Sequence, residues 1–326
     1  MGLREIQPTA NIVQKGMEKA SLKSRCIASY RKFLKSRQLL ILFLPGLIFY
    51  LLFRYAPMYG ILIAFKKYSP FLGVSKSPWI GLDNFKNFFN SPDFFVLFKN
   101  TFLIGFYNLL WNFPAPIVFA IILNESRMPK LKKGVQTVSY LPSFLSTVIV
   151  CSMAIDFLSP SGGVVNRIIQ FFGGKPVYFM IKPEWFRTVY VATGMWSGIG
   201  TSSIVYLAAL TNIDPQLYEA GRVDGCGRLR AIWHITIPSI LPTIVTMLIL
   251  NVGSIINVGY EKILILYNAA TYSTADVFST YVYRRGLQGG NFGLGTAVDL
   301  FNSIIALILL FTTNTISRKL TETSLW

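Results

Sequence analysis

The chain has 326 residues, of which 52% are hydrophobic and only 14% are charged. Soluble globular domains carry about 25% charged residues, so this composition argues against a soluble protein and indicates a membrane protein. The 31 Lys and Arg residues outnumber the 14 Asp and Glu residues, and the net charge is +17. Because much of this excess lies beside apolar runs, membrane orientation and contact with anionic lipid explain it better than nucleic acid, which we do not expect as a partner.

The residue types also argue against several enzyme classes. Cys26, Cys151 and Cys226 are an odd number at wide spacing, so they match neither a disulfide framework nor a zinc pattern. The single histidine, His234, nearly excludes a histidine-based metal cluster or catalytic triad, and we expect it at the surface. The chain has no G-x-x-x-x-G-K-[ST] motif. We therefore expect no catalytic residue, metal or cofactor in this chain, and any ATP must be bound by another chain.

In chain order, residues 1–38 form a basic tail, and the apolar run that follows starts too late for a cleaved signal peptide. A membrane span needs about 20 mostly apolar residues. Six stretches meet this requirement, namely 39–65, 101–123, 135–157, 186–210, 240–261 and 294–316. Pro114 and Pro116 predict a kink in the second. The sequence thus predicts an all-α polytopic membrane protein with six transmembrane helices.

Basic residues predict the orientation of these helices. If the N-terminus is cytoplasmic, the inner segments hold 18 Lys and Arg residues and the outer segments hold 12. The excess of positive charge inside favours an arrangement with both ends in the cytoplasm. The predicted domains are then the tail, the first span, an outer loop at 66–100, a core domain at 101–316 with an inner loop at 211–239, and a C-terminal tail at 317–326.

The inner loop 211–239 is the most informative segment of the chain. Asp214 can cap a helix and Pro215 suits its first position, while Gly225 offers a turn. We expect a second helix that begins at Arg228 and that Pro238 and Pro242 end before the fifth span. One face of this helix is expected to carry Leu229, Ile232, Trp233 and Thr236. From the residues alone, this helix–turn–helix either transmits movement from a soluble partner or merely connects two spans.

The spacing in this loop resembles a known family. Glu219-Ala220-Gly221, three residues, Gly225, nine residues and then Ile235-Thr236-Ile237-Pro238 is similar to the "EAA" loop of permease subunits of bacterial binding-protein-dependent ABC importers. Gly221 replaces the second alanine of the pattern, and Ile237 replaces a leucine. Further segments resemble the carbohydrate-uptake branch of this family, namely Leu44-Pro45-Gly46, 81–85 and Asn100-Thr101. Residues 259–268 and 280–284 resemble its oligosaccharide subgroup, which includes aldouronate-type permeases.

The resemblance implies a type I ABC importer permease in the bacterial cytoplasmic membrane that moves a sugar, in particular an oligosaccharide. It implies a second homologous permease subunit, ATPase subunits that bind ATP and Mg, and an extracytoplasmic sugar-binding protein. The residues that it implies for coupling to the ATPase are Tyr218, Glu219, Ala220, Gly221, Asp224, Gly225, Ile235 and Pro238. Catalysis by Glu219 and Asp224 is not expected, because neither has a histidine or metal partner in the loop.

Polar residues inside the spans are candidates for a sugar path, because such groups are costly in hydrocarbon without partners. On the fifth span the candidates are Asn251, Ser254, Asn257 and Tyr260, spaced at about one helical turn; on the second they are Tyr107, Asn108 and Trp111, beside Asn112. The alternative role for these residues is hydrogen bonding between helices.

Asp299 lies within the predicted sixth span, where a lipid-facing charge would cost several kcal/mol. An alternative function is therefore an ion- or proton-coupled secondary carrier that uses Asp299 and Asp156. We expect instead that Asp299 lies near the outer surface or at an interface with a basic partner. The sequence shows no internal inverted repeat of the kind that such carriers often have.

Overall fold

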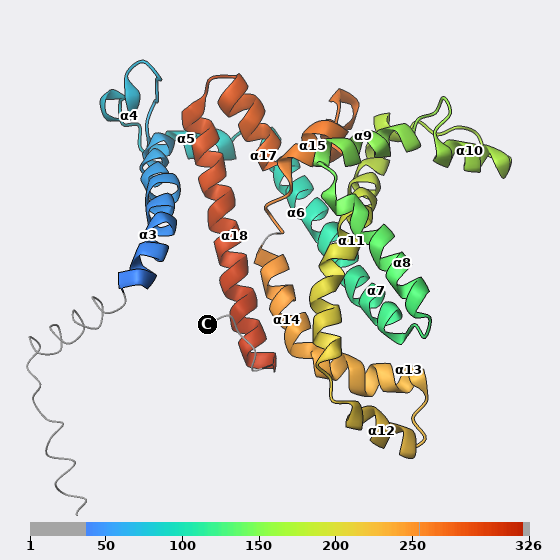
Figure 1. The fold of residues 1–326 in the computed structure, drawn as a ribbon. Coiled ribbons are helices and arrows are strands. Elements are labelled where there is room, and N and C mark those ends of the chain that lie inside the picture. Colours follow the sequence, from blue (N-terminus) through green and yellow to red (C-terminus); the bar gives the residue numbers. More distant parts are fainter. Residues whose placement is uncertain (1–36, 254, 322–326) are drawn as a thin grey trace, which may run out of the picture. The chain divides into compact units, whose positions relative to one another are not determined.

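The computed structural model describes residues 37–253 and 255–321, and within them it is almost entirely helical (Figure 1). Extended pairing in the described residues is limited to one isolated bridge between Lys66 and Trp79. The prediction of an all-α protein is confirmed for this part of the chain. The described residues fall into two separate units, one up to residue 60 and the other from residue 61 onward.

The N-terminal unit contains α3 (Arg37–Tyr50), the π-helical turn η1 (Leu51–Tyr55) and the start of the 3-10 helix η2 (Ala56–Phe65). Apolar side chains from Ile41 to Tyr59 are exposed in it. An exposed apolar helical surface of this kind suits contact with lipid.

The second unit begins with two short helices, α4 (Gly73–Lys76) and α5 (Asp83–Phe89). The buried amide of Asn84 donates to the carbonyl oxygens of Ala64 at 2.8 Å and Lys66 at 3.2 Å. These two bonds tie α5 to the chain that precedes it. The outer-loop stretch 66–100 is therefore partly helical.

The predicted second span is formed by α6 (Asp93–Asn112) and α7 (Pro114–Glu125). The two helices are separated by Phe113 alone, and Pro114 is the first residue of α7. Because proline has no N–H to continue the helical hydrogen bonds, the interruption falls where the sequence predicted it.

The predicted third span at 135–157 is not one helix. α8 (Pro129–Tyr140) continues into the 3-10 turn η3 (Leu141–Phe144), and α9 (Thr147–Phe157) then leaves at a bend of 107°. Pro142 removes a backbone donor inside the stretch. Ser146 then starts a new helix by accepting a hydrogen bond from the Ile149 N–H at 3.3 Å.

The long helix α11 (Pro183–Thr211) follows α10 (Val164–Phe171) and the turn η4 (Phe179–Ile181). It packs against α6, α7, α8 and the later helix α14, so it lies in the middle of the second unit (Figure 1). A Cβ on Gly200 would lie 2.2 Å from the Ser139 carbonyl oxygen. The absence of a side chain at this position lets α8 and α11 come into close contact.

The chain then forms α12 (Pro215–Val223), α13 (Arg228–Ala231), the π-helical segment η5 (Ile232–Thr236) and α14 (Ile237–Gly253) without a break between the last three. The prediction that Pro238 and Pro242 end the second helix of the loop is wrong. In η5 the Ile237 N–H bonds to the Ile232 carbonyl, five residues back. This wider hydrogen bonding accommodates Pro238, which has no N–H to donate.

The predicted fifth span 240–261 is also too long, because α14 ends at Gly253. A Cβ on Gly253 would lie 2.4 Å from the Leu310 side chain, so α14 and α18 (Phe292–Thr321) approach closely there. Glycine and β-branched residues with low helix propensity follow. The chain continues through short elements, namely α15 (Tyr260–Leu266), η6 (Ala269–Thr271), α16 (Tyr272–Ala275), α17 (Phe278–Tyr281) and η7 (Val282–Gln288).

Four helices in the described residues are long and apolar enough to cross a membrane, and a fifth is added if the bent α8–α9 pair is one span. The four are Ile41–Phe65, Asp93–Glu125, Arg228–Gly253 and Phe292–Lys319. α11 does not belong to this set, although it has 29 residues. Its serine, threonine and glycine residues lower its apolar character.

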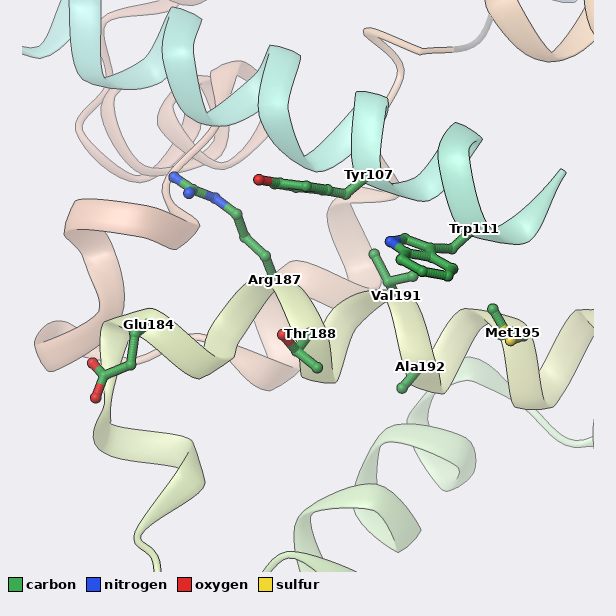
Figure 2. A pocket seen from close by; sticks show the side chains of 8 residues that line it. All are labelled: Tyr107, Trp111, Glu184, Arg187, Thr188, Val191, Ala192 and Met195. Atoms are coloured by element: carbon green, nitrogen blue, oxygen red, sulfur yellow. The ribbon is translucent and has the colours of Figure 1, made fainter. Parts of the chain in front are cut away.

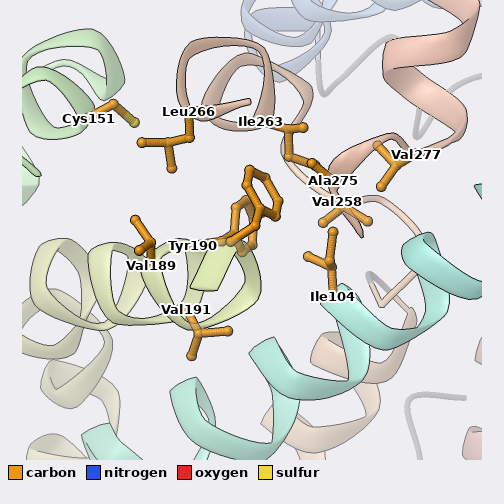
Figure 3. Close-up of a cluster of buried hydrophobic side chains, with 11 residues drawn as sticks. Ile104, Cys151, Val189, Tyr190, Val191, Val258, Ile263, Leu266, Ala275 and Val277 are labelled. Atoms are coloured by element: carbon orange, nitrogen blue, oxygen red, sulfur yellow. The ribbon is translucent and has the colours of Figure 1, made fainter. Parts of the chain in front are cut away.

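A core of buried apolar residues surrounds Tyr190 of α11 (Figure 3). Ile104 of α6 and Cys151 of α9 contribute to it, together with Val258 and Ile263 from the segment after α14. The core therefore joins elements from four parts of the sequence. This packing holds the irregular segment after Gly253 against α11.

Candidate functional site

Residues 214–238 form a helical hairpin whose first arm starts as the sequence predicted. The Asp214 carboxylate accepts a hydrogen bond from the Gln216 N–H at 2.9 Å, and Pro215 is the first residue of α12. This cap satisfies one of the unpaired donors at the helix start.

The turn of the hairpin requires glycine. Gly225 has φ +72°, in the left-handed region that other residues rarely adopt. Around it the Cys226 N–H donates to the Gly221 carbonyl at 2.8 Å and the Gly225 N–H donates to the Arg222 carbonyl at 3.1 Å. This is the pattern of a helix that ends in a left-handed glycine, and the predicted turn is confirmed.

The two arms of the hairpin are joined by direct contacts. The hydroxyl oxygens of Tyr218 and Thr236 are 2.9 Å apart, and Thr236 is buried. A Cβ on Gly221 would lie 2.9 Å from the Cδ1 atom of Ile235, so the missing methyl group leaves room for the facing arm. The prediction that Thr236 shares a face with Leu229 and Trp233 is wrong, because Thr236 faces α12 and is buried whereas the other two are exposed.

The exposed residues of the hairpin include both charged and apolar side chains. The side chains of Glu219 and Asp224 are exposed, as is that of Ala220. Three large apolar side chains are also exposed, with Val223 at 88%, Leu229 at 77% and Trp233 at 68%. Exposed apolar side chains of this size suit contact with another protein or with the membrane. Pro238 is exposed at the base of the second arm, and His234 is at the surface as expected.

The predicted sugar-path residues of the fifth span do not lie on one helix. Asn251 is in the last turn of α14, Asn257 lies in the irregular segment beyond it, and Tyr260 starts α15. Ser254 lies outside the described residues. Nevertheless, Asn251 and Asn257 line a cavity of about 110 Å³ together with Asn108 of α6, so the fold brings together amides that the sequence assigned to two different spans.

A larger cavity of about 500 Å³ lies between α6 and α11 and contains two other predicted residues, Tyr107 and Trp111 (Figure 2). α11 contributes Glu184, Arg187 and Thr188 to its lining. Tyr260 lines neither of these cavities. It belongs to a third one of about 620 Å³.

Arg187 was not singled out from the sequence, where it counted only as a basic residue for orientation. Its Nη2 atom donates to the Asn100 side-chain oxygen at 3.0 Å. The Asn100 amide in turn donates to the carbonyl oxygens of Ser273 and Asp276, each at 3.1 Å. Asn100 is fully buried and holds the arginine in place. The only signal for Arg187 in the sequence was its position as a basic residue in the first turn of the predicted fourth span.

Lys262 of α15 was also missed. Its Nζ atom donates to the Tyr190 carbonyl at 2.5 Å and lies 4.2 Å from the centre of the Tyr190 ring. Burial lowers the pKa of Lys262 to about 8, because removal from water disfavours the charged form. It lines the same cavity as Tyr260, with Ser197 and Thr201.

Asp299 is exposed on α18. Within the described residues no Lys, Arg or His nitrogen lies within 4.0 Å of its carboxylate; the two ion pairs found there are Lys86–Asp83 and Arg284–Asp276. The expected basic partner of Asp299 is therefore not in this part of the chain, and a partner on another subunit stays a prediction.

Comparison with known proteins gives consistent matches over most of the chain. Residues 116–321 match the family described as "Binding-protein-dependent transport system inner membrane component". The chain is similar to the polygalacturonan/rhamnogalacturonan transport system permease protein YteP of Bacillus subtilis (strain 168), with 45% identity over 90% of this chain and 92% of the relative. It is also similar to protein LplB of the same organism, with 43% identity over 90% and 92%.

A solved structure has the same fold. The chain is similar to a chain from a bacterial ABC transporter involved in the import of the acidic polysaccharide alginate, with a TM-score of 0.84 and 42% identity. The match covers 90% of this chain and 99% of the other. The alternative of a proton-coupled carrier gains no support from these matches. The chain belongs to the family of inner membrane components of binding-protein-dependent transport systems, and is thus a multi-pass transport subunit of the cytoplasmic membrane and not an enzyme.

Proposed function

We propose that this chain is one of two paired permease subunits of an ATP-driven importer that moves oligosaccharides into the cell. The observation that carries the proposal is the 45% identity to a polygalacturonan/rhamnogalacturonan permease over 90% of the chain. The aromatic lining of the cavity between α6 and α11 supports it, because sugar rings stack on aromatic side chains through their apolar faces.

The proposal includes six spans with both chain ends in the cytoplasm. α11 serves as the fourth span, since 29 residues form a helix of about 44 Å, longer than the hydrocarbon core of about 30 Å. The bent pair α8–α9 serves as the third. Residues 1–38 and 317–326 are then cytoplasmic, the loop 66–100 is outside, and 101–316 is the core domain with the loop 211–239 inside.

The hairpin 214–238 docks in a cleft of a separate ATPase subunit, which binds ATP and Mg. Glu219 forms the charged contact, and the exposed Val223, Leu229 and Trp233 supply the apolar area. Gly225 allows the tight turn, and the small residues Ala220 and Gly221 keep the docking helix α12 narrow. Tyr218, Ile235 and Pro238 hold the second arm. An extracytoplasmic binding protein delivers the sugar on the other side.

The test is uptake by the importer assembled with its sister permease, ATPase and binding protein. Glu219→Ala is expected to lower ATPase co-purification or uptake at least tenfold while the variant still inserts in the membrane. Asp83→Ala is the matched control, because it removes an exposed carboxylate from α5, in the loop 66–100 that is proposed to be outside. Normal uptake by Glu219→Ala, or nucleotide hydrolysis by this chain alone, would overturn the proposal.

A further inference from the structure

Arg187 carries a positive charge into the cavity between α6 and α11 without a carboxylate to balance it. Glu184 lines the same cavity but forms no ion pair with Arg187, and Figure 2 shows it pointing away. Asp276 is near Asn100 through its backbone, but its side chain is bound by Arg284 at 2.5 Å and by Thr280 at 2.7 Å. Within the described residues, the charge of Arg187 is therefore not neutralised by an ion pair.

The guanidinium of Arg187 is held in position, but not all of its N–H donors form hydrogen bonds. Nη2 is bound to Asn100, whose amide is fixed by two backbone carbonyls. The Nε atom is buried and has no hydrogen-bond partner in the described part of the chain. Arginine has five N–H donors, and Asn100 takes only one of them, so the guanidinium keeps donors for an acceptor that comes from outside the chain.

Aromatic side chains lie next to this donor. Tyr107 and Arg187 point toward one another across the cavity, and Trp111 lies one turn further along α6 (Figure 2). The cavity volume of about 500 Å³ is within the range of about 300–1,000 Å³ that small-molecule sites occupy. A fixed cation beside two aromatic rings suits a ligand that combines a sugar ring with a negatively charged group.

We propose that Arg187 binds the carboxylate of a uronic acid unit as the oligosaccharide passes through the permease, with Tyr107 and Trp111 against the sugar ring. This inference rests on the proposed function and adds the chemical class of the sugar. Arginine suits the task because its N–H groups donate to carboxylate oxygens in strong, charge-assisted hydrogen bonds. The matched proteins whose names include polygalacturonan and alginate act on polymers of this class.

The test uses the complete importer with its native partner proteins. Uptake is measured for oligogalacturonides and for methyl-esterified oligogalacturonides of the same length, which have the same rings but no charge. The ratio of the two rates is compared between wild type and Arg187→Gln. Because both rates come from one preparation, any loss of folded protein and the preference of the binding protein cancel.

The expected result is a ratio that falls at least tenfold in Arg187→Gln and is partly restored in Arg187→Lys. Lys182→Gln is the matched control, since it removes the same charge from the exposed residue before α11, outside the cavity. A ratio that is equal in wild type and Arg187→Gln, or that falls equally in Lys182→Gln, would overturn the inference alone. If the wild-type importer takes up neutral oligosaccharides but neither galacturonide, the inference is overturned and the proposed function stands. If it takes up no oligosaccharide of any kind, the proposed function is overturned and the inference falls with it.

Discussion

The hydroxyl groups of Tyr218 and Thr236 are 18 residues apart in the chain and form a hydrogen bond of 2.9 Å that joins the two arms of the helical hairpin. Thr236 belongs to the π-helical segment that leads directly into α14. A force on the exposed arm α12 can therefore pass through this bond into a membrane-spanning helix. We predict that, in the importer proposed above, the hairpin transmits force through this connection in addition to docking on the ATPase.

Removal of this bond is expected to loosen the hairpin. Tyr218→Phe deletes one hydroxyl, and a hydrogen bond of this kind contributes about 1 kcal/mol. Amide hydrogen exchange in residues 215–238 should become several-fold faster, and the number of sugars moved per ATP hydrolysed should fall. Tyr178→Phe changes an exposed tyrosine far from the hairpin in sequence and serves as control. Equal exchange rates in wild type and Tyr218→Phe would refute the mechanical role.

At Gly225 the effect of backbone conformation can be tested separately from steric clashes. An added Cβ at Gly225 meets nothing within 4 Å, but φ is +72°, so Gly225→Ala costs about 1–2 kcal/mol in backbone strain. Gly227 is as open but has φ −72°, and Gly227→Ala should be neutral. We expect Gly225→Ala to reduce the amount of ATPase that co-purifies, and Gly227→Ala to leave it unchanged. Identical co-purification of the two variants would show that the turn geometry is not needed.

Contact between α8 and α11 depends on Gly200. Its added Cβ would lie 2.2 Å from a backbone oxygen of Ser139, which cannot move without shifting α8. Gly200→Ala is expected to destabilise the folded chain by about 1–3 kcal/mol, measured as a lower Tm in detergent. At Gly198, two residues earlier, the nearest atom would be 4.0 Å away, so Gly198→Ala is the control. A Tm that changes equally in both variants would contradict this account of the packing.

Lys262 predicts a pH dependence of stability. Its pKa is about 8 in the folded chain and 10.5 in the absence of burial. Between these values the unfolded chain binds the proton more strongly, so the free energy of unfolding rises with pH. The gain is at most about 3.5 kcal/mol, because a tenfold change in proton affinity corresponds to about 1.4 kcal/mol.

The measurement is the difference in Tm between wild type and Lys262→Gln from pH 7 to pH 10.5. Titration of all other groups cancels in this difference. The difference should be constant below about pH 8 and should shift in favour of wild type above it. A difference in Tm that does not depend on pH would mean that burial in the folded chain does not lower the pKa of Lys262.

Features encoded by neighbouring residues were predictable. The cap at Asp214, the start at Pro215 and the turn at Gly225 each depend on backbone dihedral angles and hydrogen bonds within a few residues. The interruption at Pro114 has the same local cause. Membrane character and the helical class follow from composition and from the lengths of apolar stretches, which are also properties of the sequence alone.

The locations of helix ends inside apolar stretches were not predictable. Hydropathy does not distinguish the bend near Ser146 or the end of α14 at Gly253 from a continuous span, because both stretches remain apolar enough on average over about 20 residues. At the end of α14, Gly253 lies close to Leu310 of α18, about 60 residues later in the chain. Contacts over such a distance leave no periodic signal near the residue that they affect.

The sequence by itself determined the membrane class, the helical content and the local form of the hairpin, because these depend on composition and on interactions between residues close together in the chain. Only the tertiary structure decided which polar residues meet: Asn108 shares a cavity with Asn251 and Asn257, while Arg187 joins Tyr107 and Trp111 and is held by Asn100. The physical reason is that these encounters require α6, α11 and the segment after α14 to pack together. That packing minimises the free energy of the whole unit and not of any one segment.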